Sequence, residues 1–189
     1  MNRGTVILFI SFIWMLSEII LARARHSQTK DSKELDRASL TYLSITILFS
    51  TFIGVFLGLR GIGFVAAKDH FISTVGIFLL LLGLIIRWAA IVTLKKYFTV
   101  KVTIFENHQI IKKGIYGFIR HPGYAGSLLS FLGLGLSFSN WLSTVIIFIP
   151  ILTAFLYRIR VEEKALTQAF GDEYLKYCKV TKRLIPKIY

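Results

Sequence analysis

Cysteine is almost absent from this chain of 189 residues, and its scarcity excludes several classes of protein. The single cysteine, Cys178, cannot form an internal disulfide, so a disulfide-stapled scaffold is excluded. It has no CxxC partner and no neighbouring histidine pair, so no metal site is predicted. The GxGxxG, GKS/T and HExxH signatures are also missing. Nothing therefore indicates a Rossmann site, a P-loop or a zinc protease.

Acidic residues are scarce as well. Only 10 Asp and Glu oppose 23 Lys and Arg, which leaves a net charge of +13. The basic residues flank apolar runs and do not form a separate soluble domain, so no nucleic-acid partner is predicted. They are expected instead to attract the anionic headgroups of membrane lipids.

Charge of either sign is missing from long stretches of the chain. Hydrophobic residues make up 54% of the sequence and the mean hydropathy is +0.64, values typical of membrane proteins. Apolar runs at 5–22, 38–59 and 72–94 each predict a transmembrane helix. We expect the first run to be a retained helix, because arginines interrupt the small residues that a signal-peptide cleavage site needs.

The uncharged stretch 124–157 is too long for one span. As a single helix it would measure about 50 Å, against about 30 Å of hydrocarbon. The polar residues 137–140 predict a turn, which leaves a helical hairpin with arms at 124–137 and 141–157. The sequence therefore predicts an all-α, polytopic integral membrane protein with about five transmembrane helices.

The distribution of lysine and arginine predicts the orientation. These residues concentrate in 23–37, in 95–120 and after the last span, whereas only Arg3, Arg60 and Lys68 fall on the other side. By the positive-inside rule, the N-terminus lies outside and the C-terminus in the cytoplasm. We expect the cell's inner membrane as the location.

The chain is predicted to form a single membrane domain, 1–189. Residues 1–94 would be a three-span scaffold, and 95–189 would carry a cytoplasmic loop and a C-terminal helical region with the functional site. Gly54 and Gly58 form a GxxxG pair, which predicts close helix packing. Arg87 lies within a span, and two interpretations remain open: it snorkels to the surface or lines a cavity.

Two polar clusters at one membrane face are the candidate functional residues. Arg120 and His121 precede Pro122, which predicts a helix start at the membrane surface. Arg158 and Glu162 lie four residues apart and share a helix face, whereas Glu163 is rotated by about 100°. Alone, each cluster also fits an ordinary topology signal or ion pair.

Together these elements resemble the isoprenylcysteine carboxyl methyltransferase family. The pattern H-x-x-[IV]-x-x-G-x-Y-x-x-x-R-H-P-x-Y occupies 108–124, R-x-x-x-E-E occupies 158–163, and F-G-D-E-Y-x-x-Y occupies 170–177, with R-L-x-P near the end. The chain is similar to a small, prokaryotic-type member, since it is shorter than eukaryotic members. The resemblance implies a membrane enzyme that transfers a methyl group from S-adenosylmethionine to the carboxylate of a lipidic or isoprenoid acceptor, leaving S-adenosylhomocysteine.

The resemblance also implies roles for individual residues. Catalysis would involve Arg120, Arg158 and Glu163, with Arg158 binding the substrate carboxylate. Glu162 would hold the amino group of the cofactor. The implied cofactor-binding residues are His108, Gln109, Ile110, Ile111, Tyr116, His121, Pro122, Gly123, Tyr124 and Glu162.

Three other interpretations stay open. The ending Pro186-Lys187-Ile188-Tyr189 is similar to that of membrane sterol reductases, which use NADPH. A phospholipid N-methyltransferase would differ only in its acceptor. A non-catalytic lipid-binding membrane module would keep the fold and bind no cofactor.

Overall fold

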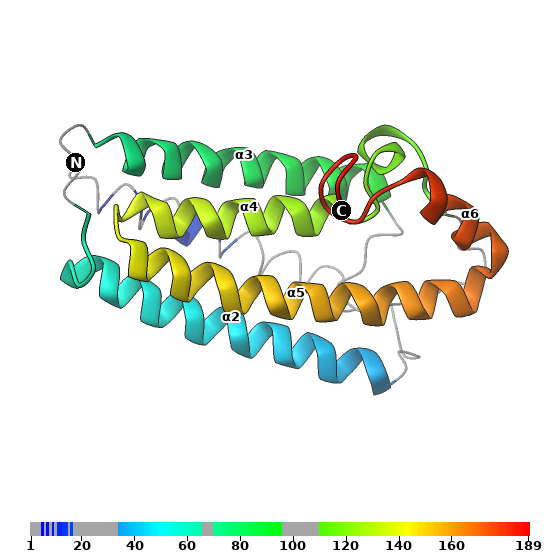
Figure 1. The fold of residues 1–189 in the computed structure, drawn as a ribbon, viewed down its shortest axis with the longest axis horizontal. Coiled ribbons are helices and arrows are strands. Elements are labelled where there is room, and N and C mark those ends of the chain that lie inside the picture. The colour runs from blue at the N-terminus through cyan, green and yellow to red at the C-terminus, as the bar shows by residue number, and fades with distance from the viewer. Residues whose placement is uncertain are drawn as a thin grey trace.

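The protein is a bundle of long helices with shorter helices and loops gathered at one end (Figure 1). The computed structural model describes residues 5, 7, 9, 11–14, 16, 34–65, 70–95 and 110–189. Its elements are α2 (Glu34–Arg60), α3 (Phe71–Leu94), the 3-10 helix η2 (Gly114–Gly117), α4 (Pro122–Ser137), α5 (Trp141–Phe170) and α6 (Asp172–Val180). The described part of the chain is helical apart from its turns and isolated bridges, so the predicted all-α class is confirmed.

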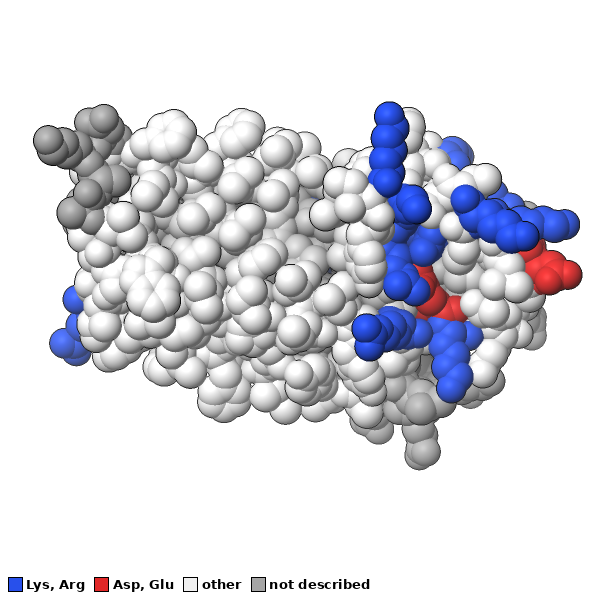
Figure 2. Space-filling view, viewed as in Figure 1, with Lys and Arg blue, Asp and Glu red and all other residues white. Residues whose placement is uncertain are grey.

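Helices α3, α4, α5 and α2 lie side by side in that order (Figure 1). The start of α4 and the end of α5 meet at the same end of the bundle, together with η2 and α6. We call this the polar end. Lysine and arginine gather there, whereas the flank of the bundle is almost free of charge (Figure 2). This separation is the one expected for helices embedded in lipid with one end in water.

Among the described residues, the helices long and apolar enough to cross a membrane are Ala38–Arg60, Phe71–Leu94 and Trp141–Phe170. Helix α4, with 16 residues, falls short of that length. The predicted total of five spans is therefore not confirmed. The predicted hairpin is confirmed, because α4 ends at Ser137 and α5 begins at Trp141. The first predicted span, 5–22, lies only partly within the described residues, and those between 5 and 16 are helical.

Glycines bring α3 and α4 into backbone contact. A Cβ added to Gly126 would lie 2.6 Å from the amide nitrogen of Arg87 and 2.6 Å from the carbonyl oxygen of Gly83. Lower in the same seam, a Cβ on Gly133 would lie 2.5 Å from the carbonyl oxygen of Gly76. Without a hydrophobic drive inside lipid, such small residues allow the close van der Waals packing that holds membrane helices together.

Small and polar residues also join α2 to α5. The hydroxyl of Ser143 donates to the carbonyl of Gly54 at 2.7 Å, and a Cβ on Gly54 would collide with Ile147. Gly58 likewise leaves room for the ring of Phe138. The predicted packing role of these two glycines is thus confirmed. The Asn140 side chain caps α5 by accepting from the Ser143 amide at 2.9 Å.

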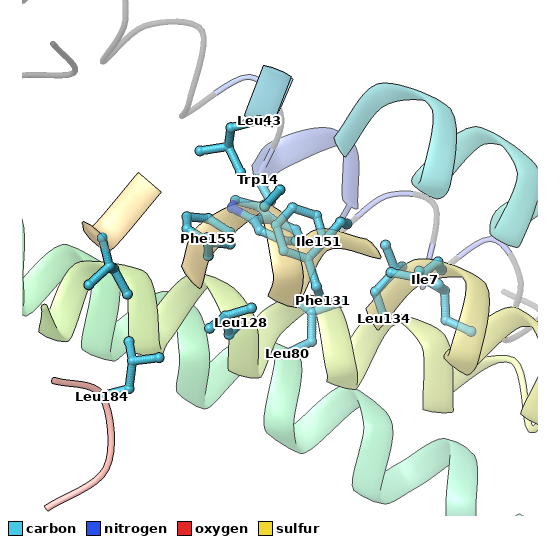
Figure 3. Close-up of a cluster of buried hydrophobic side chains, with 13 residues drawn as sticks. Ile7, Trp14, Leu43, Leu80, Leu128, Phe131, Leu134, Ile151, Phe155 and Leu184 are labelled. Carbon is cyan, nitrogen blue, oxygen red and sulfur yellow. The ribbon is translucent and has the colours of Figure 1, made fainter. Parts of the chain in front are cut away.

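The buried core runs between the helices, and residues near the N-terminus take part in it (Figure 3). The ring of Trp14 lies 4.6 Å from that of Phe131 on α4. Phe155 and Ile151 of α5 complete this region. The core therefore locks α4 against α5 up to the polar end, where the candidate site lies.

Candidate active site

The loop before α4 is held in place by the end of the chain. The amides of Arg120 and His121 donate to the carbonyls of Lys182 and Arg183 at 2.7 and 3.0 Å. Ile119 and Lys182 form an isolated parallel bridge. We call residues 181–189 the tail. Pro122 occupies the first turn of α4, as predicted. Proline suits this position because it has no amide proton, and the first amides of a helix have no acceptor within the helix.

Helix α6 folds back over this loop. Gly171, with φ of 52°, ends α5 in the left-handed region and redirects the chain. The buried Tyr177 donates its hydroxyl to the carbonyl of Tyr116 at 2.7 Å. Burial raises the pKa of Tyr177 to about 12, so the phenol stays protonated at neutral pH. The contact ties η2 to α6.

Glu163 is the centre of a charged cluster. Its Oε1 accepts from Arg120 Nε at 2.9 Å and from His121 Nε2 at 3.3 Å. Its Oε2 accepts from Arg183 Nε at 2.8 Å. This last hydrogen bond raises the pKa of Arg183 above its ordinary value. Arg120 also donates to the carbonyl of Cys178 at the end of α6. We call Arg120, His121, Glu163 and Arg183 the clamp.

Glu162 lies on the other side of His121. Its Oε2 is 3.8 Å from His121 Nδ1, and this buried oxygen has no hydrogen-bond partner within the described part of the chain. The rings of His121 and Tyr124 are nearly parallel, with centroids 5.6 Å apart. The Tyr124 hydroxyl interacts with both Glu162 and Arg158. A carboxylate oxygen that can still accept hydrogen bonds thus lies beside the stacked rings of His121 and Tyr124.

Arg158 is the most deeply buried charge of this region, with 1% of its surface exposed. Its guanidinium donates to the hydroxyl of Ser39 on α2 at 2.6 Å. A buried arginine is costly unless its donors are satisfied. Its contact with Ser39 places a buried positive charge between α5 and α2.

Arg87 lines the seam between α3 and α4. Its Nη1 donates to the Ser127 hydroxyl at 2.8 Å and to the Gly123 carbonyl at 3.3 Å. These contacts do not test the two interpretations left open by the sequence, snorkelling and a cavity, which stay predictions. Arg87 ties the first turn of α4 to α3.

The structure brings most of the sequence-predicted site residues to the polar end. Tyr116, His121 and Pro122 are buried there, and Gly123 is half-buried. Ile110 and Ile111 are half-buried before η2. His108 and Gln109 lie outside the described residues, so their predicted role is untested. Surface hollows lie over α6 and the tail, and the lining of the one beside the clamp includes Arg120 and Arg183.

Sequence reasoning assigned no role to Arg183, Ser39 or Tyr177, which the structure adds to the region. Arg183 and Tyr177 belong to the R-L-x-P and F-G-D-E-Y-x-x-Y patterns, so a signal for them was present. Ser39 is a lone serine at the start of an apolar run and carried no signal.

The apolar flank, the long apolar helices and the charged polar end define a helical integral membrane protein. Comparison with known proteins then identifies its family. The model of the isoprenylcysteine carboxyl methyltransferase (ICMT) family matches residues 75–168. A probable protein-S-isoprenylcysteine O-methyltransferase of Oryza sativa subsp. japonica is 31% identical over 175 residues, which cover 91% of this chain and 90% of the relative. The chain belongs to the isoprenylcysteine carboxyl methyltransferase family and is a membrane methyltransferase.

Further relatives agree with this assignment, and a solved structure shares the fold. Protein-S-isoprenylcysteine O-methyltransferase B of Arabidopsis thaliana is 31% identical, over 91% of this chain and 87% of the relative. The Saccharomyces cerevisiae enzyme is 36% identical over 56% of this chain and 45% of its own length. The structure of the eukaryotic intramembrane Ras methyltransferase ICMT superimposes with a TM-score of 0.68 at 22% identity, covering 99% of this chain and 68% of that one.

The expected prokaryotic type is not confirmed. That expectation rested on the short chain, but the plant relatives align over nearly their whole length. A compact chain therefore occurs among eukaryotic members too. A methyltransferase needs a methyl donor.

Proposed function

We propose that this protein transfers a methyl group from S-adenosylmethionine to the carboxylate of an isoprenylcysteine-type acceptor. The donor would bind at the polar end, beside His121, Tyr124 and Glu162. The acceptor would approach from the lipid with its carboxylate toward Arg158. The names of the relatives, which act on isoprenylcysteine, support this choice of acceptor.

The proposal is carried by Oε2 of Glu162, a buried oxygen with no hydrogen-bond partner among the residues that the structure describes. A buried carboxylate oxygen without a partner is costly, and an ammonium group satisfies it with a charge-assisted hydrogen bond. The amino group of S-adenosylmethionine supplies that ammonium. Tyr116, His121 and Tyr124 add flat apolar surface suited to an adenine ring. His108, Gln109, Ile110, Ile111, Pro122 and Gly123 stay assigned to the same pocket by the family pattern.

Arg158 is proposed to bind the acceptor carboxylate. Its guanidinium is held by Ser39 and interacts with Tyr124, so it is oriented before any ligand arrives. Arginine binds carboxylates through two parallel hydrogen bonds. Because the charge is buried, its attraction for a carboxylate is less screened than it would be in water.

When bound, S-adenosylmethionine supplies an electrophilic methyl group on a sulfonium. The acceptor carboxylate is already ionised at neutral pH, so no strong base is required. The protein would contribute position: Arg158 orients the carboxylate and Glu162 fixes the donor. Arg120 and Glu163, predicted to be catalytic, would act by holding this arrangement together.

The topology completes the proposal. We place the protein in the inner membrane, with the C-terminus and the polar end on the cytoplasmic side. We count 5–22 and α4 as further spans, for a total of five. Helix α4 is short, but much of its surface is buried against α3 and α5 rather than facing lipid. Residues 1–94 would serve as scaffold and 95–189 would carry the site.

Calorimetric binding of S-adenosylhomocysteine to the detergent-purified protein tests the donor site. Glu162→Gln keeps the shape and removes the charge. We expect its Kd to rise about 10- to 100-fold, the value of a charged hydrogen bond of about 1.5–3 kcal/mol. Glu173→Gln is the matched control, because Glu173 makes a surface ion pair with Lys112 at 2.8 Å. Equal affinity in Glu162→Gln and wild type would disprove the assignment, and binding of NADPH alone would favour the reductase.

A further inference from the structure

The clamp links the end of the chain to the proposed donor site. Arg183 comes from the tail, Glu163 from α5, and Arg120 and His121 from the loop before α4. Three segments that are distant in sequence thus meet on one carboxylate. The side chain of Glu163 is 12% exposed, so these contacts are only weakly screened by water.

Glu163 sets the orientation of the His121 ring. An ionised carboxylate can only accept hydrogen bonds, so Nε2 is the nitrogen that donates in the 3.3 Å contact. The other nitrogen, Nδ1, then faces Oε2 of Glu162. The same ring stacks on Tyr124. A rotation of His121 would therefore disturb both the carboxylate and the aromatic surface of the proposed donor site.

Arg183 in turn fixes Glu163. Two of its nitrogens, Nε and Nη2, each lie 2.8 Å from Glu163 Oε2. The guanidinium also rests on the ring of Tyr189 at 5.5 Å and donates to its hydroxyl. Without Arg183, one oxygen of Glu163 would lose its partner, and the carboxylate would be free to turn toward Arg120 alone.

We propose that Arg183 is a positioning residue for the methyl-donor site, acting through Glu163 on the ring of His121. This inference rests on the proposed function. The described side-chain contacts of Arg183 are with Glu163 and Tyr189, so the guanidinium acts through other residues. Its loss should therefore affect donor binding more than acceptor binding or the chemical step.

The test compares Arg183→Gln with wild type in two measurements, the Kd for S-adenosylhomocysteine and steady-state kinetics with a farnesylcysteine acceptor. We expect the Kd and the donor KM to rise about tenfold. Loss of an outer hydrogen-bond partner at metal sites costs about 10- to 100-fold in affinity, which sets the scale. The acceptor KM and kcat should change less than twofold. Arg183→Lys, which keeps the charge but not the fork, should recover part of the affinity.

Two controls separate this role from general stabilisation. Lys187→Gln removes an exposed charge from the same tail and should bind as wild type does. In a Glu163→Gln background, Arg183→Gln should add little, because the two residues act in one chain of contacts. The backbone hydrogen bonds that hold the tail do not involve the substituted side chain, so the variant should fold.

The outcomes are distinct. Suppose that Arg183→Gln binds S-adenosylhomocysteine as tightly as wild type while Glu162→Gln binds it weakly. This result would overturn the positioning role of Arg183 and leave the proposed function intact. A parallel loss of kcat, of both KM values and of thermal stability would assign Arg183 a structural role and also overturn the proposal. If wild type itself fails to bind S-adenosylhomocysteine, the proposed function fails and the inference falls with it.

Discussion

The glycine seam between α3 and α4 predicts a sharp contrast between neighbouring positions. In Gly126→Ala, the new Cβ would lie 2.6 Å from backbone atoms of both Arg87 and Gly83. Backbone atoms cannot move aside as a flexible side chain can, so the helices must separate. In Gly123→Ala, the nearest atom is the Ala90 Cβ at 3.8 Å, an ordinary contact. Two glycines about one helical turn apart thus differ: a Cβ clashes at Gly126 and fits at Gly123.

The magnitudes follow from this geometry. Overpacking costs about 1–3 kcal/mol, and it exceeds the gain of up to about 1 kcal/mol from replacing glycine with alanine in a helix. Gly126→Ala should therefore lower the thermal midpoint, by about 2–4 °C for each kcal/mol lost. Gly123→Ala should leave it unchanged or raise it. Thermal unfolding in detergent, followed by circular dichroism, measures both variants. A Gly126→Ala protein as stable as Gly123→Ala would refute the proposed seam.

Two further predictions concern the polar end. Arg158→Gln should raise the acceptor KM at least about tenfold with little change in the Kd for S-adenosylhomocysteine. Ser39→Ala removes only the hydroxyl that accepts from Arg158 and should have a smaller effect. An acceptor KM in Arg158→Gln equal to that of wild type would remove Arg158 from the acceptor site. Cys178, the single cysteine, should react with an impermeant maleimide only from the cytoplasmic side of sealed vesicles. Because burial raises the pKa of this thiol, labelling should be done above pH 8, and labelling from outside would reverse the proposed orientation.

The hairpin and the helix start at Pro122 were predictable because their causes are local. An uncharged stretch longer than the bilayer must turn, and residues 137–140 are the polar break within it. The end of α5 at Gly171 follows from the same local chemistry, since glycine accepts a positive φ at little cost. The number of spans was less predictable. Helix α4 is short and packs against α3 and α5, and the composition of the chain does not reveal these contacts.

Spacing did not reveal which distant residues these charges contact. Arg158 and Glu162 share a helix face, and the spacing suggested an ordinary ion pair. The fold adds contacts that spacing could not predict: Arg158 donates to Ser39 on another helix, and Glu162 lies 3.8 Å from His121. Glu163, which spacing set apart, became the centre of the clamp.

The sequence by itself determined the membrane class, the hairpin and the set of residues that resemble the family, because apolar run length and motif order are properties of the chain alone. Only the tertiary structure decided which charges meet. Arg183 and Glu163 are separated by a helix and a turn, and no periodicity connects them. Their contact exists because Gly171 reverses the chain and lays the tail across the loop before α4.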